Sequence, residues 1–142
     1  MLKEYNFDDI TVYKMGRTVG PVVPYLVHAF LLGDTLIDTG TAHAQREFLS
    51  ALSGKKITRI INTHFHEDHT GNNAVIQGKY AAEILAHRDS LQYIEHTERI
   101  PLKPYQILVW KRPEPSHATE ITDRVTIPGY SFNVIHTRGH SE

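Results

Sequence analysis

Hydrophobic residues are grouped along the chain in short runs, and the first runs are typical of strands. Two runs rich in β-branched and aromatic residues, 7–14 and 22–32, are separated by turn-forming glycine and proline. The second is apolar almost throughout, which predicts a strand buried on both faces. A glycine and an aspartate at 33–34 predict a hairpin turn into a third strand over 35–38. We expect an antiparallel meander of these strands, with His28 as a hydrogen-bonded core residue.

The pattern then changes to helical spacing and returns to a strand. Within 41–54, apolar residues such as Phe48 and Leu52 recur at the spacing of one helix face. The β-branched run 57–62 follows directly. Strand, helix and strand in this order predict a βαβ unit whose helix packs on one face of the sheet.

The remaining pattern predicts shorter elements around one irregular segment. These are a helix over 70–77 that Gly78 ends, a helix from about 87 to 96, and a hairpin of 121–127 with 130–136, while composition leaves 80–86 ambiguous. Residues 97–118 are rich in proline and contain one tryptophan. They either line a substrate pocket or form a surface excursion with one packed tryptophan.

Composition is that of a soluble globular domain. The chain has 142 residues, of which 40% are hydrophobic and 22% charged, so one domain is expected. A formal net charge of −1 gives no electrostatic reason to expect nucleic acid or an anionic membrane as a partner. The absence of cysteine excludes disulfides, thiolate zinc sites and cysteine nucleophiles. No apolar run has the length of a signal or membrane-spanning segment, so we expect a cytoplasmic protein.

Four potential metal ligands follow the predicted strand over 57–62: His64, His66, Asp68 and His69. In an extended chain, side chains two residues apart point to the same side, so His64, His66 and Asp68 can converge. His69 then needs only a turn to join them. Imidazole and carboxylate together suit zinc above other ions. A solvated surface cluster is the alternative, but four ligands at this spacing after a buried strand favour a metal site.

The segment 63–69, which reads THFHEDH, resembles the H-x-H-x-D-H signature of the metallo-β-lactamase-fold superfamily, in its glyoxalase II-like branch. Two further segments match in family order. Residues 36–40 resemble the strand and turn ahead of the motif, and 137–141 resemble the segment that carries the third histidine of the first metal. The sequence departs from the pattern at Asn72, where a second glycine is usual, and at Arg138, where proline is usual. The resemblance implies an α/β fold, a four-layer αββα sandwich, of which this chain contains about the N-terminal half to two-thirds.

The resemblance also implies five metal ligands: His64, His66, Asp68, His69 and His140. Three imidazoles would hold the first ion and leave a position open for water, which is the catalytic arrangement for zinc. Asp68 and His69 would begin a second site. The family pattern continues with further strands, a bridging aspartate and a last histidine, which this sequence lacks. We therefore expect residues 1–142 to form a single domain that is incomplete at its C-terminus.

The expected chemistry is hydrolysis. Zinc, two ions per complete domain, is the expected cofactor, and iron or manganese is compatible with the same ligands. A zinc-bound hydroxide, bridging the two ions, would attack a small ester, thioester or lactone. Asp68 would hold the hydroxide and carry a proton to the leaving group, which makes it the expected catalytic residue. Asp38 is expected beneath the site, where it would orient the ligands by hydrogen bonds without binding metal.

Two other functional classes stay open. One is a mononuclear iron oxidoreductase similar to persulfide dioxygenases, which would use the same three histidines and consume oxygen. The other is a metal-binding fragment without turnover. A hydrolase is preferred because His69 resembles the dinuclear glyoxalase II-like enzymes, and because His66 is not the glutamate of flavodiiron oxidoreductases. The expected partner is a small-molecule substrate, with no nucleic acid and no membrane, and a homo-oligomer is compatible with the sequence.

Overall fold

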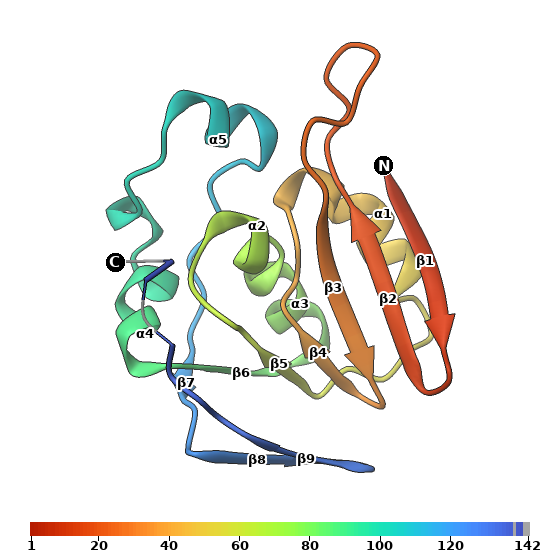
Figure 1. Ribbon diagram of the computed structural model, residues 1–142, viewed down its shortest axis with the longest axis vertical. Helices are drawn as coiled ribbons and strands as arrows, with labels where there is room; N and C mark the ends of the chain where they lie inside the picture. Colours follow the sequence, from red (N-terminus) through yellow and green to blue (C-terminus); the bar gives the residue numbers. More distant parts are fainter. Residues whose placement is uncertain (138, 141–142) are drawn as a thin grey trace.

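A seven-stranded sheet forms the centre of the computed structural model, which describes residues 1–137 and 139–140 (Figure 1). Its strands lie in chain order: β1 (Leu2–Phe7), β2 (Ile10–Met15), β3 (Val27–Leu32), β4 (Thr35–Ile37), β5 (Arg59–Ile61), β6 (Glu83–Ala86) and β7 (Thr119–Glu120). The pairs from β1 to β4 are antiparallel, and those from β4 to β7 are parallel. A separate hairpin consists of β8 (Arg124–Ile127) and β9 (Tyr130–Asn133).

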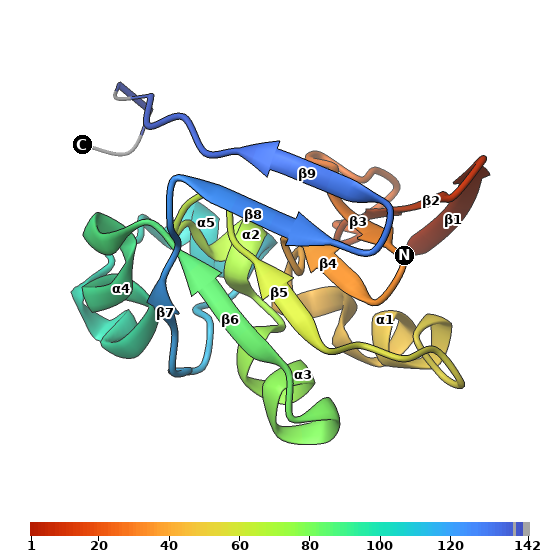
Figure 2. The ribbon, with the colours of Figure 1, turned by 90° about the horizontal axis from the view of Figure 1, so that it is seen from below.

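Helices and the hairpin lie on opposite faces of the large sheet. The helical segments are η1 (Ala42–Ala44), α1 (Gln45–Ala51), α2 (Glu67–Thr70), α3 (Asn73–Tyr80), α4 (Arg88–Glu95), η2 (Thr97–Arg99) and α5 (Pro104–Val109). Figure 2 shows α1 and α3 on one face and β8–β9 on the other. The predicted α/β class is confirmed, and the described residues supply a helix layer and two sheets of the expected sandwich. Among these residues, no helix is long and apolar enough to cross a membrane.

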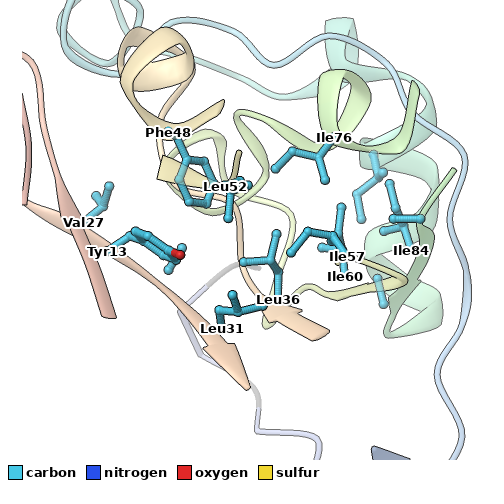
Figure 3. Close-up of a cluster of buried hydrophobic side chains, with 14 of the residues drawn as sticks. Tyr13, Val27, Leu31, Leu36, Phe48, Leu52, Ile57, Ile60, Ile76 and Ile84 are labelled. Carbon is cyan, nitrogen blue, oxygen red and sulfur yellow. The ribbon is translucent and has the colours of Figure 1, made fainter. Parts of the chain in front are cut away.

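The main core lies between the large sheet and the helices (Figure 3). Leu36 of β4 and Ile60 of β5 are paired in register and have no exposed surface. Phe48, Leu52 and Ile76 are also fully buried, and they cover this face from α1 and α3. Burying a side chain of this size contributes about 1.5–3 kcal/mol. The core therefore fixes β4 and β5 side by side, with their C-terminal ends at one edge.

The βαβ unit and the meander are confirmed. The β4 strand, α1 and the parallel strand β5 follow one another as the helical spacing of Phe48 and Leu52 predicted. Gly33 has φ +59 in the tight turn that joins β3 to β4. The predicted hairpin around Pro128 and Gly129 is present, although its strands are shorter than expected.

Two strand predictions are wrong. The run 7–14 contains a turn at its start, because Asp8 adopts φ +51 and reverses the chain between β1 and β2. The run 22–32 forms a strand only over Val27–Leu32, where burial alternates in its first part. His28 points outward on that strand and is exposed, so it is not a core histidine. One face of this antiparallel strand packs on the core, which leaves the other free.

The helix expected over 70–77 is also different. It is divided into α2 and α3, and α3 runs through Gly78 to Tyr80. The residue that ends α3 is Ala81, with φ +53 in the left-handed region. The helix predicted near 87–96 is confirmed as α4. The segment 97–118 contains two short helical turns, η2 and α5.

Candidate metal centre

The loop between β5 and α2 holds the first two predicted ligands. His64 and His66 lie on either side of Phe65, whose buried ring stacks on Tyr93 of α4 with 4.2 Å between ring centroids. The backbone N–H of His69 donates to the carbonyl of His66 at 2.9 Å and starts α2. The expectation that Asp68 continues an extended chain is therefore wrong, since it already belongs to the helical turn.

His64, His66 and His140 converge on one point. One potential ligand atom of each lies within 4.8 Å of the other two. Ring centroids are 4.6 Å apart for His64 and His66, and 4.9 Å from each of these to His140. His140 arrives from the segment that follows β9, so the two sheets contribute to one group of imidazoles. Of the matching segment 137–141, residues 138 and 141 lie outside the described residues.

Burial keeps the imidazoles of the loop neutral. Desolvation, and then the neighbouring imidazoles, lower the pKa of His64 to about 3. Burial also lowers the pKa of His66, with His140 as the next cause. A neutral imidazole carries a free nitrogen lone pair, which is the form that binds a metal ion.

The hydrogen bonds of Thr63 determine which nitrogen of His64 is free. The Thr63 hydroxyl donates its only proton to Oδ2 of Asp38 at 2.8 Å. It must therefore accept from Nδ1–H of His64, 3.0 Å away. The lone pair of His64 then lies on Nε2, which is buried and has no hydrogen-bond partner among the described residues. An unpartnered buried nitrogen on a ring that lies against two other imidazoles fits a metal ion.

Asp38 also orients His69. Its Oδ2 lies 2.7 Å from Nδ1 of His69, while its Oδ1 accepts the backbone N–H of Thr63 at 2.8 Å. Burial alone would lower the pKa of His69, but the hydrogen bond and charge of Asp38 outweigh burial and raise it. Nε2 of His69 is left facing Oδ2 of Asp68, 3.6 Å away. The carboxylate of Asp38 thus contacts both His69 and Thr63, and Asp68 and His69 lie together beside His64.

A buried polar network anchors the loop to β4. The Thr39 hydroxyl donates to Oδ1 of Asn73 at 2.9 Å, and Nδ2 of Asn73 donates to Oδ1 of Asn62 at 2.7 Å. Nδ2 of Asn72 donates to the carbonyls of Thr39 and Thr41 at 2.6 and 3.0 Å. Asn72, which differs from the usual glycine of the motif, therefore joins α3 to the turn after β4.

A cavity of about 730 Å³ opens beside the imidazoles. His64 and His140 lie on its wall, and part of its apolar lining comes from strands of both sheets and the chain next to them: Ile37, Ile61, Ile121, Val125, Phe132 and Val134. The segment 97–118 contributes no lining residue. Its tryptophan, Trp110, packs partly buried against the main core, which agrees with the interpretation of a surface excursion.

Sequence reasoning missed several residues near the site. Thr63 is part of the motif, but its hydrogen bonds depend on the fold and no pattern predicts them. His87, Asp89 and His136 also line the cavity and form a second group of potential ligands. His87 and His136 are 49 positions apart in the sequence, so spacing alone gave no signal.

The comparisons with known proteins agree with this geometry. The chain is 28% identical over 118 residues to a hydroxyacylglutathione hydrolase of Polaromonas sp., and 35% identical over 74 residues to one of Nitrosococcus oceani. These alignments cover 83% and 50% of this chain, but only 42% and 28% of the relatives. The chain thus spans less than half the length of the curated relatives it matches.

Solved structures show the same fold. A beta-lactamase domain protein from Burkholderia ambifaria superposes with a TM-score of 0.70 at 20% identity, covering 97% of this chain and 48% of that protein. A metallo-beta-lactamase from Pontibacter korlensis gives a TM-score of 0.65 at 16% identity, covering 92% of this chain and 58% of that one. The family model described as the metallo-beta-lactamase superfamily matches residues 19–142. With the motif, the fold and this match in agreement, the chain belongs to the metallo-beta-lactamase superfamily.

Proposed function

We propose that this domain belongs to a metal-dependent hydrolase that acts on a small ester, thioester or lactone. The proposal rests on the buried Nε2 of His64, unpartnered among the described residues, and on the convergence of His64 with His66 and His140. Three imidazole nitrogen donors leave a fourth position for water at a tetrahedral ion, which favours zinc and a catalytic role. Asp68 and His69 offer two further donors, so we propose a second ion beside the first.

Zinc, when bound, would lower the pKa of a water molecule and supply a hydroxide at neutral pH. Side chains of the protein carry out the remaining steps. The carboxylate of Asp68 is only 20% exposed and lies next to the imidazoles, so its Oδ2 can accept a proton from the water and pass it to the leaving group. Asp38 and Thr63 hold the rings of His69 and His64 in the required tautomers.

The cavity supports a small substrate that has both apolar and polar parts. Aliphatic and aromatic side chains share its walls with polar groups, among them the imidazoles of His64 and His140. Both curated relatives are named hydroxyacylglutathione hydrolases, and an acyl derivative of glutathione is a thioester. Of the three substrate classes, we therefore place the thioester first.

The experiment measures metal content and hydrolysis together. The purified chain is analysed for zinc, iron and manganese, and is then assayed with a thioester, an activated ester and a lactone. We expect zinc and thioester hydrolysis, with loss of both in His64→Ala. The matched control is His28→Ala, which removes an exposed imidazole from β3 and should change neither.

Other outcomes identify the competing classes. Iron with oxygen consumption on a persulfide would replace the hydrolase by an oxidoreductase. Zinc that is lost in His64→Ala, but with no turnover of any substrate, would indicate a metal-binding domain without activity. Unchanged metal content in His64→Ala would contradict the site itself.

A further inference from the structure

A second group of metal-ligating side chains lines the same cavity as the imidazoles described above. His87 is the N-cap of α4, Asp89 lies in the first turn of that helix, and His136 follows β9. One potential ligand atom of each lies within 4.8 Å of the other two. The group therefore connects α4, which lies next to the large sheet, with the segment that follows β9 of the hairpin.

The distances are close to those of a coordinated ion. Nδ1 of His87 is 3.5 Å from Oδ2 of Asp89, and Nε2 of His136 is 4.0 Å from the same oxygen. Ligand atoms about 2.0–2.1 Å from a tetrahedral ion are about 3.3 Å apart. The three side chains are 28%, 63% and 40% exposed in the order His87, Asp89 and His136, so they can close this difference by small rotations.

The hydrogen bond that His87 makes identifies Nδ1 as the acceptor nitrogen of its ring. Nδ1 of His87 accepts the backbone N–H of Asp89 at 3.3 Å, so its one lone pair lies on Nδ1, and an ion bound there would replace this hydrogen bond. A carboxylate oxygen of Asp89 lies 3.5 Å from the same nitrogen. The ring of His136 packs against that of His87 with 3.9 Å between centroids. Two imidazoles and a carboxylate are thus gathered on one side of the cavity.

We propose that His87, Asp89 and His136 form a peripheral site for a divalent transition-metal ion such as zinc, cobalt or nickel. Two nitrogen donors and one oxygen donor favour these ions over magnesium and calcium, which prefer oxygen. The N-terminus of α4 carries partial positive charge, which opposes a cation there, and Asp89 offsets it. The peripheral ion is therefore held more weakly than one bound by the buried imidazoles.

An ion at this site connects α4 to the segment that leads to His140. His136 precedes His140 by four residues, and both line the cavity. Occupation of the peripheral site fixes the start of this segment, and so restricts the positions that His140 can reach. The proposal needs only the metal-binding side chains and does not depend on the hydrolase activity.

The test separates the two groups of ligands. A His64→Ala/His66→Ala variant, checked for fold by circular dichroism, is titrated with cobalt(II) and followed by visible absorption and equilibrium dialysis. We expect one bound cobalt per chain. Adding His136→Ala or Asp89→Asn to this variant should abolish that binding. His96→Ala is the matched control, because His96 is an exposed imidazole near Glu98 at the other end of α4, and it should bind cobalt as before.

The outcomes are decisive in both directions. No cobalt in the double variant, or equal binding with and without His136→Ala and Asp89→Asn, overturns the proposal. If the double variant loses its fold, the unmodified chain is loaded with zinc and dialysed to remove the weakly held ion. It is then titrated with nickel(II), and its histidine ring protons are followed by NMR. The site is supported if the ring-proton signals of His87 and His136 broaden at a lower nickel(II) concentration than those of His96. Equal broadening of all three overturns it.

Discussion

Oδ2 of Asp38 lies 2.7 Å from Nδ1 of His69, and the same oxygen accepts the hydroxyl proton of Thr63. One carboxylate therefore orients two imidazole rings by hydrogen bonds: that of His69 directly, and that of His64 through the hydroxyl of Thr63. Asp38 occupies the turn after β4 with φ +58, a conformation that aspartate and asparagine adopt more readily than most residues. The turn places the carboxylate under the loop that carries the ligands.

Asp38→Asn should weaken metal binding while it preserves the fold. Asparagine tolerates the left-handed backbone, and its Oδ1 can still accept the N–H of Thr63. Its amide nitrogen would donate to Nδ1 of His69, which would move the ring proton to Nε2 and prevent coordination. We expect zinc affinity at His69 to fall by about 10- to 100-fold. A competition titration against a chromophoric chelator measures this loss.

The control for this change is Asp123→Asn, which removes an exposed carboxylate in the loop before β8. Its zinc affinity should equal that of the unmodified chain. Equal affinity in Asp38→Asn and Asp123→Asn would show that the tautomer of His69 does not depend on Asp38.

Thr63→Val should affect the first site in a different way. Valine keeps the shape of the side chain and the backbone N–H to Asp38, but it has no hydroxyl to accept from Nδ1–H of His64. We expect a mixture of His64 tautomers and about a tenfold or greater loss of zinc affinity. Nitrogen chemical shifts of the His64 ring report the tautomer. Thr63→Ser restores the hydroxyl and should recover both the single His64 tautomer and the zinc affinity. If the valine and serine variants do not differ, Thr63 does not transmit the effect of Asp38 to His64.

The sequence predicted the parts of the fold that depend on strong local signals. The helical spacing of Phe48 and Leu52 and the run before His64 indicated the βαβ unit, because both elements bury one continuous face. The break at Asp8 was missed because an aspartate with φ +51 carries no sequence signal as clear as glycine. His28 was misplaced because an apolar run does not show whether a strand has one buried face or two.

The site was predictable to the extent that it lies in one segment. Spacing alone placed His64, His66, Asp68 and His69 together, and the resemblance to the family added His140. Spacing gave the wrong conformation for Asp68, since the chain turns into α2 directly after His66. The group of His87, Asp89 and His136 depends on α4 meeting the chain after β9, a tertiary contact that leaves no local pattern.

Gly71→Ala should destabilise the metal loop. A Cβ at Gly71 would lie 2.4 Å from the backbone nitrogen of Ala42 and 2.5 Å from the carbonyl oxygen of Gly40, and backbone atoms cannot move aside as side chains do. Gly71 also donates its N–H to the Gly40 carbonyl at 2.9 Å, so a shift breaks that bond. We expect a loss of about 1–3 kcal/mol in the free energy of unfolding. Urea denaturation followed by circular dichroism measures it.

Gly78→Ala is the matched change in the neighbouring helix. Its Cβ would meet nothing within 4 Å, and Gly78 lies inside α3 with ordinary helical geometry. Alanine is the better helix former, so we expect a gain of about 0.5–1 kcal/mol. A loss at Gly78, or no loss at Gly71, would contradict the packing described for this region.

Zinc should stabilise the fold because its ligands come from two sheets. His64 and His66 follow β5 of the large sheet, whereas His140 follows β9 of the hairpin, so an ion that binds all three holds the sheets together. At 100 times the dissociation constant, binding adds about 2.7 kcal/mol to stability. For a domain of this size, that is a rise in Tm of roughly 5–10 °C, which a chelator should reverse. His140→Ala should remove most of the rise, whereas His117→Ala, which deletes a largely exposed imidazole, should keep it. The same rise in both variants would mean that the ion does not connect the two sheets.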